Sequence, residues 1–201
     1  MKIPTVYQLK PAFQGLLRPL VRFLAGKGIT ANQVTLFAVL LSSLEGIWIY
    51  FRPEASPALL ALPIVLFARM ALNAIDGMLA REHDQKSQLG GILNELGDIV
   101  SDTVLYLPLA MHPAISAELM VAFAILAIFT EFTGVLSIVC GSSRRYDGPM
   151  GKSDRAFFWG AVGFVGGIGI SLNPWINYLV SLSLLLLVLT IINRARRALV
   201  E

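Results

Sequence analysis

The sequence predicts an all-α polytopic membrane protein with six transmembrane helices and an N-terminal amphipathic helix that lies in the membrane interface. Of its 201 residues, 56% are hydrophobic and only 14% are charged, a balance that is rare in soluble domains. The apolar residues gather in six runs, each about long enough to cross a hydrocarbon core of about 30 Å. We therefore expect one membrane domain, residues 29–201, after an N-terminal segment, residues 1–28.

The N-terminal segment carries the pattern of an interfacial helix. Between Phe13 and Leu24, apolar residues recur three and four positions apart, while Gln14, Arg18 and Arg22 occupy the other side. A helix with an apolar face and basic edges is suited to lie in a membrane surface. A helix packed on a protein partner would show the same pattern, so both interpretations stay open.

Prolines, glycines and polar residues mark the ends of this helix. Pro11 is predicted to start it, Pro19 to kink it and the Gly26–Gly28 segment to end it. Thr30 and Gln33 then fit a capping box at the start of the next helix. In this motif each side chain accepts a hydrogen bond from the backbone N–H of the other residue.

Residues 29–201 hold the predicted spans, the third of which is polar through its first half. We place them at Val34–Phe51, Ala58–Leu79, Leu89–Met111, Leu119–Cys140, Ala156–Leu172 and Trp175–Ile192. Gly163 and Gly167 are spaced as a helix-contact motif, used either within one protomer or between two. Five aromatic residues are predicted to anchor the spans at the membrane interfaces: Trp48, Tyr50, Trp159, Trp175 and Tyr178.

The positive charges predict the orientation of these spans. Lysines and arginines cluster before the first span, after the second, after the fourth and after the sixth, whereas the opposite loops carry only Arg52. Because basic loops stay in the cytoplasm, both termini are predicted to be cytoplasmic.

Two polar helix faces stand out within this apolar chain, in a stretch that runs from Asn73 to Asp102. Each face falls on a single arc of a helical wheel, the first comprising Arg69, Asn73, Asp76, Gly77 and Ala80, and the second Asn94, Glu95, Asp98 and Asp102. Ionisable groups are costly in apolar surroundings and usually serve a function there. Carboxylate and amide oxygens suit Mg²⁺, Mn²⁺ or Ca²⁺, so the pattern predicts a hard-metal site between two antiparallel helices.

The same stretch resembles the signature of the CDP-alcohol phosphatidyltransferases, D-x-x-D-G-x-x-A-R, eight residues, then G-x-x-x-D-x-x-x-D. The eight-residue gap Glu82–Leu89 is intact. The matching positions are Asp76, Gly77, Ala80, Arg81, Gly90 and Asp98. Asn73 and Asn94 replace the other two aspartates.

The resemblance implies a bacterial inner-membrane enzyme that moves a phosphatidyl group from CDP-diacylglycerol to a soluble hydroxyl acceptor and releases CMP. It implies a homodimer, and Asp98 as the base that takes the acceptor proton. It implies metal ligands at Asn73, Asp76, Asn94 and Asp98, and a CDP site formed by Asn32, Thr35, Gly77, Ala80, Arg81 and Gly90.

The two asparagines bear on the number of metal ions. The family is understood to use one or two Mg²⁺ or Mn²⁺ ions, with Ca²⁺ as an expected inhibitor. Here Asp76 and Asp98 alone offset one divalent ion. Glu95 and Asp102 lie on the same arc and are alternative ligands that would restore the missing charge. We therefore expect one metal, or a second metal shifted by a turn.

The acceptor is predicted to be anionic, such as a polyol phosphate, because basic residues cluster near the signature. The candidate acceptor-binding residues are Arg69, Glu131, Lys152, Arg155, Arg144 and Arg145. For Arg69, a structural ion pair with Asp76 or Glu131 is an equal alternative, and for Glu131 the equal alternative is a pair with a cation on a neighbouring helix. For the lysine and arginines of the loop, the alternative is that their charges serve only to set the orientation of the spans in the membrane.

Two other function classes compete with this enzyme. A catalytically inactive relative would bind CDP-lipid or act as a scaffold, which the two asparagines favour. A transporter would line an ion path with the buried charges, but the sequence shows none of the repeats or broken helices typical of that class. Nothing in the sequence indicates a nucleic-acid partner.

Overall fold

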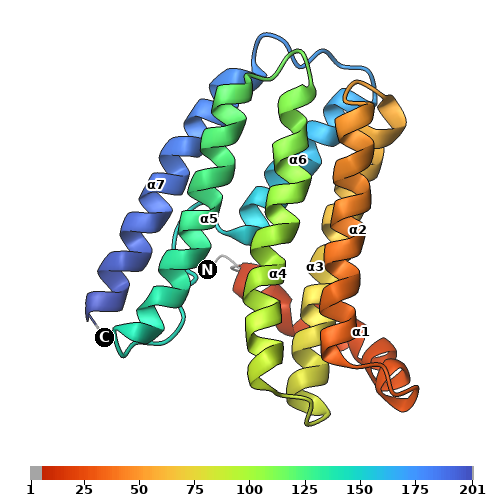
Figure 1. Ribbon diagram of the computed structural model, residues 1–201, viewed down its shortest axis with the longest axis vertical. Helices are drawn as coiled ribbons and strands as arrows, with labels where there is room; N and C mark the ends of the chain where they lie inside the picture. The colour runs from red at the N-terminus through yellow and green to blue at the C-terminus, as the bar shows by residue number, and fades with distance from the viewer. Residues whose placement is uncertain (1–5, 201) are drawn as a thin grey trace, which may run out of the picture.

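The computed structural model describes the backbone of residues 6–200 and the side chains of residues 12–200, and it is built from helices (Figure 1). The elements are α1 Val6–Gly26, α2 Ala31–Phe51, α3 Ser56–Glu82, α4 Gln88–Tyr106, the 3₁₀ helix η1 Leu107–Met111, α5 Ala117–Val139, α6 Lys152–Gly167 and α7 Ile176–Val200.

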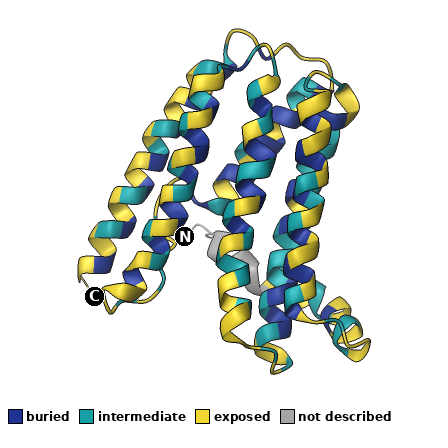
Figure 2. Cartoon of the chain, viewed as in Figure 1, coloured by how far each residue is buried: buried dark blue, intermediate teal, exposed yellow. Residues whose placement is uncertain are grey.

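Helices α2 to α7 form an up-and-down bundle, and α1 lies across the end at which α2 begins and α3 ends (Figure 1). Helix α2 packs on α3 and α4, α3 on α6, α4 on α5, and α5 on α7. Figure 2 shows that buried residues line the inner faces of these helices while exposed residues cover the outer faces. Large apolar side chains such as Phe37, Phe67 and Leu185 are more than half exposed, as expected of surfaces that face lipid.

Four of the six predicted spans are long and apolar enough to cross a membrane among the described residues: α2, α3, α5 and α7. The other two predicted spans, α4 and α6, lie within the same bundle. Helix α4 is followed by a separate 3₁₀ turn over Leu107–Met111, where Pro108 cannot continue the α-helical hydrogen bonds. Helix α6 has only 16 residues and starts at Lys152 instead of Ala156.

The N-terminal helix is confirmed as a helix, and it ends at Gly26 as predicted, but it starts earlier than expected. It starts upstream of Pro11 and runs through Pro19, so the prediction that Pro11 starts it was wrong. It packs on α3: Val21 is fully buried in a cluster with Met78, and Arg18 bonds both carboxylate oxygens of Glu82 at 3.0 and 3.1 Å.

Two sequence motifs have clear outcomes in the bundle. Thr30 and Gln33 form the predicted capping box at the start of α2. Gly163 lies so close to α3 that a Cβ there would come within 2.8 Å of the Leu59 carbonyl oxygen, and Gly167 packs in the same way against Leu60. This motif therefore serves contact between α6 and α3 of one protomer.

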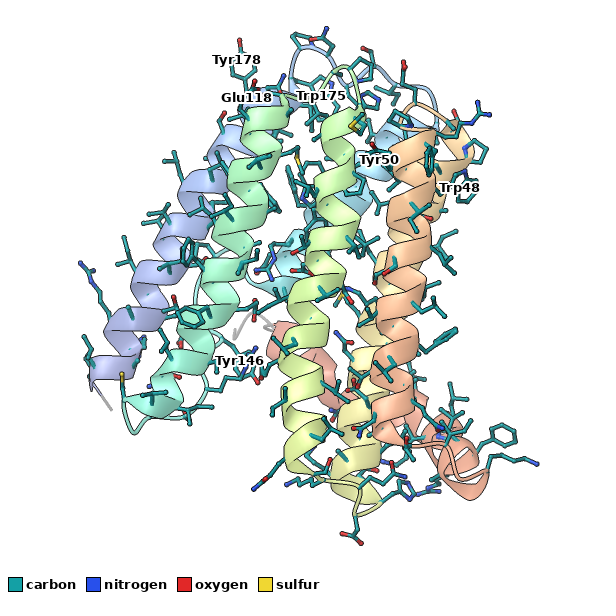
Figure 3. All side chains as sticks on the ribbon, viewed as in Figure 1. Trp48, Tyr50, Glu118, Tyr146, Trp175 and Tyr178 are labelled. Carbon is teal, nitrogen blue, oxygen red and sulfur yellow. The ribbon has the colours of Figure 1, made fainter. Side chains whose placement is uncertain are left out.

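Four of the five aromatic residues predicted as anchors lie at one end of the bundle, and the fifth is buried. Trp48, Tyr50, Trp175 and Tyr178 gather at the end of the bundle opposite α1 (Figure 3). Trp159 is fully buried among Tyr106, Phe123 and Phe158, so the prediction that it anchors the interface was wrong. An apolar neighbourhood on every side outweighs the interfacial preference of its ring.

The segment between α5 and α6, residues 140–151, turns back into the bundle, so that α6 begins partway along it (Figure 1). Arg145 N–H donates to the Gly134 carbonyl at 3.1 Å, and Met150 N–H donates to the Thr190 hydroxyl at 2.9 Å. Gly148 has a φ of +125°, and a Cβ there would collide with Thr190. This return brings the first residues of α6 to the polar face of α4.

Candidate active site

The two signature helices meet α2 at a polar site near the α1 end of the bundle. Helices α3 and α4 are joined by a tight turn, where Ser87 caps α4 by accepting from Gly90 N–H at 2.9 Å. The hydroxyl of Thr35 in α2 donates to Oδ2 of Asp76 in α3 at 2.7 Å. Asp76 is buried, so this hydrogen bond satisfies one oxygen of a costly carboxylate.

Asp98 is the point at which three helices converge. Its Oδ1 accepts from Asn73 Nδ2 in α3 at 2.8 Å, and its Oδ2 accepts from Lys152 Nζ at the start of α6 at 2.5 Å. A carboxylate is purely an acceptor, so Asn73 must present its amide nitrogen to it and point its own oxygen elsewhere. Asn94 is half-buried one turn before Asp98 on α4.

The residues predicted to bind CDP fall into two groups. Asn32, Thr35, Gly77 and Gly90 surround the site: a Cβ at Gly90 would lie 2.9 Å from Asn32 Oδ1, and one at Gly77 would lie 3.1 Å from the folded-back guanidinium of Arg81. A glycine at each of these positions therefore permits the close approach of Asn32 and Arg81. Ala80 instead packs towards α1, against the apolar cluster around Val21 and Met78.

Both residues that were predicted as alternative metal ligands, Asp102 and Glu95, form ion pairs with arginines. Asp102 is buried and paired with Arg69 and with Arg155, whose Nε and Nη2 lie 2.9 and 2.7 Å from Oδ2. Glu95 is paired with Arg144 at 2.6 Å. Burial lowers the pKa of Arg144, but the hydrogen bond and charge of Glu95 outweigh burial and raise that pKa above its ordinary value.

Glu131 extends this arrangement into one network of ion pairs across five helices. It is bonded by Arg155 at 2.8 Å and Arg144 at 3.0 Å, and Arg194 lies 3.4 Å away. Arg69 and Arg155 are fully buried. Of the residues predicted to bind the acceptor, Arg69, Glu131, Arg144 and Arg155 thus have partners inside the protein. Arg145 donates to the Arg197 carbonyl at 2.9 Å, and Lys152 contacts Asp98.

Sequence reasoning missed two residues of this region. Arg194 donates to the Thr130 carbonyl from inside the bundle, although its position after the last predicted span suggested a topology charge. The available signal was its spacing from Leu187 and Thr190, which continues the buried face of α7. Gln85, in the turn before α4, accepts from Ala31 N–H at 2.7 Å and so ties α2 to the signature turn.

Comparison with known proteins decides the family. Residues 28–193 match the sequence model of the CDP-alcohol phosphatidyltransferases. The chain belongs to this family. It is 48% identical over 196 residues to the inner membrane protein YnbA of Escherichia coli, covering 97% of this chain and 96% of that one. It is 29% identical over 104 residues to the archaetidylinositol phosphate synthase of Pyrococcus horikoshii, about half of each chain (52% and 53%).

Solved structures share the fold. The phosphatidylinositol phosphate synthase of Mycobacterium tuberculosis, in complex with manganese and citrate, superposes with a TM-score of 0.74 at 18% identity, covering 90% of this chain and 87% of that one. The same protein with CDP-DAG bound superposes with a TM-score of 0.69 at 20% identity, covering 89% of each chain. The chain is thus a member of a transferase family, and its apolar helices support a membrane protein.

The family uses divalent metals, and the polar site of this member offers oxygen ligands that suit such an ion. Among the residues that the structure describes, no three His, Cys, Asp or Glu side chains are grouped to hold a metal. Asp76 and Asp98 offer two carboxylates, and the amide oxygens of Asn73 and Asn94 are neutral hard ligands. That donor set fits a single Mg²⁺ or Mn²⁺, and Lys152 competes for one of its carboxylates.

Proposed function

We propose that this protein transfers a phosphatidyl group from CDP-diacylglycerol to a hydroxyl acceptor with release of CMP. The observation that supports it most is the convergence of Asp76 and Asp98 at a site flanked by the signature glycines Gly77 and Gly90. The reaction needs carboxylates that can bind a metal ion and act as a base, placed beside the signature glycines.

The membrane arrangement supports the same function. Helices α4 and α6 complete a six-span bundle with α2, α3, α5 and α7, and α1 lies in the interface through its exposed apolar residues Leu16, Leu20 and Phe23. The charge distribution orients the signature to the cytoplasm of a bacterial inner membrane, where soluble acceptors are available. A homodimer is expected from the family resemblance.

The chemistry follows from the placement of the side chains. Arg81 and the backbone at Gly77 bind the phosphates of CDP, with the guanidinium as a planar fork of donors. Asp98 takes the proton of the acceptor hydroxyl. The acceptor oxygen then bonds to the lipid-bearing phosphorus, the bond from that phosphorus to CMP breaks, and CMP leaves with the electron pair. A divalent ion held by Asp76, Asp98 and the amide oxygens of Asn73 and Asn94 would neutralise the pyrophosphate.

The acceptor is a hydroxyl compound that carries its own negative charge, such as a polyol phosphate. Support comes from Lys152, the side chain of which is 28% exposed at the site, and from Arg144 and Arg145 on the segment leading to it. The names of the Pyrococcus and Mycobacterium relatives also denote synthesis of inositol phosphate lipids. The buried Arg69, Arg155 and Glu131 support the acceptor site indirectly, by holding the start of α6 in place.

A second candidate is a catalytically inactive relative that binds CDP-lipid. It is favoured by the contacts of Asp98, both oxygens of which are occupied by Asn73 and Lys152. Purified protein in nanodiscs, given radiolabelled CDP-diacylglycerol, Mg²⁺ or Mn²⁺ and a panel of alcohols and polyol phosphates, separates the two. The transferase releases CMP and makes a new lipid with at least one acceptor. Donor binding without CMP release across the panel would establish the inactive relative.

A further inference from the structure

Lys152 places a positive charge directly against Asp98, one of the two signature carboxylates. Its ammonium contacts Oδ2 of Asp98 and also interacts electrostatically with Asp76 on the facing helix. The other oxygen of Asp98 is occupied by the amide of Asn73. Asp98 therefore has a cation on one side and a neutral donor on the other, both supplied by the chain itself.

The position of Lys152 is fixed by its surroundings. It is the first residue of α6, directly after Gly151, whose N–H donates to Asp154 at 2.9 Å. One turn later, Arg155 is fully buried and anchored by Asp102 and Glu131. The buried ion pairs of Arg155 thus fix the first turn of α6, and the side chain of Lys152 extends from this fixed backbone.

The negative charge at the site is sufficient to balance only one divalent ion. Four aspartates at the signature positions would carry four negative charges, whereas Asp76 and Asp98 carry two and Lys152 adds one positive charge. Asp102 and Glu95, which could have supplied further negative charge, are already paired with arginines. Hard cations bind in proportion to ligand charge, so a second divalent ion lacks the carboxylates it needs.

We propose that Lys152 is a built-in cation that takes the place of a second divalent ion, so that each protomer binds a single Mg²⁺ or Mn²⁺. This rests on the proposed function in assigning a metal-binding role to the signature. Lys152 acts as a positioning residue: it holds Asp98 and offsets part of the negative charge that Asp76 and Asp98 place around the one metal ion. The asparagines and the lysine form one set, since each removes negative charge or adds positive charge at the same site.

The test is a Mn²⁺ titration of the purified protein in nanodiscs, without donor or acceptor, followed by electron paramagnetic resonance of the free ion. The unmodified protein is expected to bind one Mn²⁺ per protomer. Lys152→Met should bind Mn²⁺ about tenfold more tightly, because the competing charge next to Asp98 is gone. Asn73→Asp, Asn94→Asp and Lys152→Met combined should bind two ions. Lys86→Met, which removes an exposed lysine from the turn before α4, is the matched control and should behave like the unmodified protein.

Two ions per protomer in the unmodified protein would overturn the proposal, as would an unchanged affinity in Lys152→Met. Lys152→Gln, which also removes the charge but keeps a polar side chain, should bind Mn²⁺ more tightly by a similar factor, so it decides the matter if the methionine variant does not fold. Lys152→Arg, which retains the charge, should keep one ion and the original affinity. Because no substrate is present, this outcome is independent of CMP release. A protein that binds one Mn²⁺ as described but never releases CMP would refute the transferase and leave the lysine's role standing.

Discussion

Asn73 on α3 donates a hydrogen bond from its side-chain amide to Asp98 on α4, with 2.8 Å between Nδ2 and Oδ1. This contact joins two signature positions without a metal ion. An aspartate at position 73 could not make it, because two carboxylates at this distance repel each other unless a cation or a proton lies between them. The asparagine therefore makes the site stable in its metal-free form.

Asn73→Asp should make the stability of the fold depend on metal. Without metal we expect a loss of about 1–3 kcal/mol, from the missing hydrogen bond and the new repulsion. Saturating Mn²⁺ should restore most of it, since binding to the folded state alone stabilises that state. Thermal unfolding in EDTA and in Mn²⁺ measures both. Asn193→Asp, at an exposed position on α7, is the control. Equal unfolding temperatures of Asn73→Asp and the unmodified protein in EDTA would contradict this reading of the contact.

Asp98→Asn should lower CMP release by about two to four decades, the usual contribution of a positioned base. CDP-diacylglycerol binding should stay within a few-fold, because the nucleotide is held by Arg81 and the signature backbone. The assay is CMP release under saturating donor, with donor affinity measured separately. Asp84→Asn is a matched control: Asp84 is exposed, in the turn after α3, with a φ of 55° that asparagine also accepts. Normal turnover by Asp98→Asn would show that another group acts as the base.

Arg155→Ala should destabilise the protein instead of selectively weakening acceptor binding. Sequence reasoning placed Arg155 in the acceptor site, but the side chain is fully buried between Asp102 and Glu131. Removing one partner of a buried ion pair leaves an uncompensated charge and typically costs about 3–5 kcal/mol. Unfolding in increasing denaturant after detergent extraction measures the loss, and Arg196→Ala, exposed on α7, is the control. A variant of normal stability with only a raised acceptor KM would restore the original assignment.

How far the sequence predicted this structure depends on the distance between partners along the chain. The capping box of Thr30 and Gln33 and the antiparallel pairing of α3 and α4 follow from local spacing, and both were predicted. The contact of Lys152 with Asp98 spans 54 residues and depends on the return of residues 140–151 into the bundle. No periodicity encodes that return, because it is set by packing around Gly134, Gly148 and Thr190.

The buried arginines show the same limit of sequence-based prediction, because the sequence predicts that a partner exists but does not identify it. The sequence indicates that an arginine inside an apolar span needs a partner, and Arg69 has one in Asp102. It does not indicate which acid is the partner: the sequence suggested Asp76 or Glu131, and this was wrong, because the structure pairs Arg69 with Asp102. Only the packed arrangement, in which Arg155 approaches Asp102 from α6, separates the two signature carboxylates from the structural one.

The acceptor should be a phosphorylated polyol, and the unmodified protein is sufficient to test this. If Lys152 and the nearby arginines of residues 140–151 attract the acceptor, glycerol 3-phosphate should have a KM roughly one to two decades below that of glycerol, since a charge-assisted contact contributes about 1.5–3 kcal/mol. The preference should shrink as salt is raised, because the cations that approach the soluble substrate are screened. The measurement is steady-state CMP release with each acceptor at low and at high salt. The KM of the donor serves as the internal control, because it is set mainly by membrane partitioning and Arg81. Equal KM values for the two acceptors, or a preference that salt leaves unchanged, would rule out recognition through charge and point to a neutral alcohol.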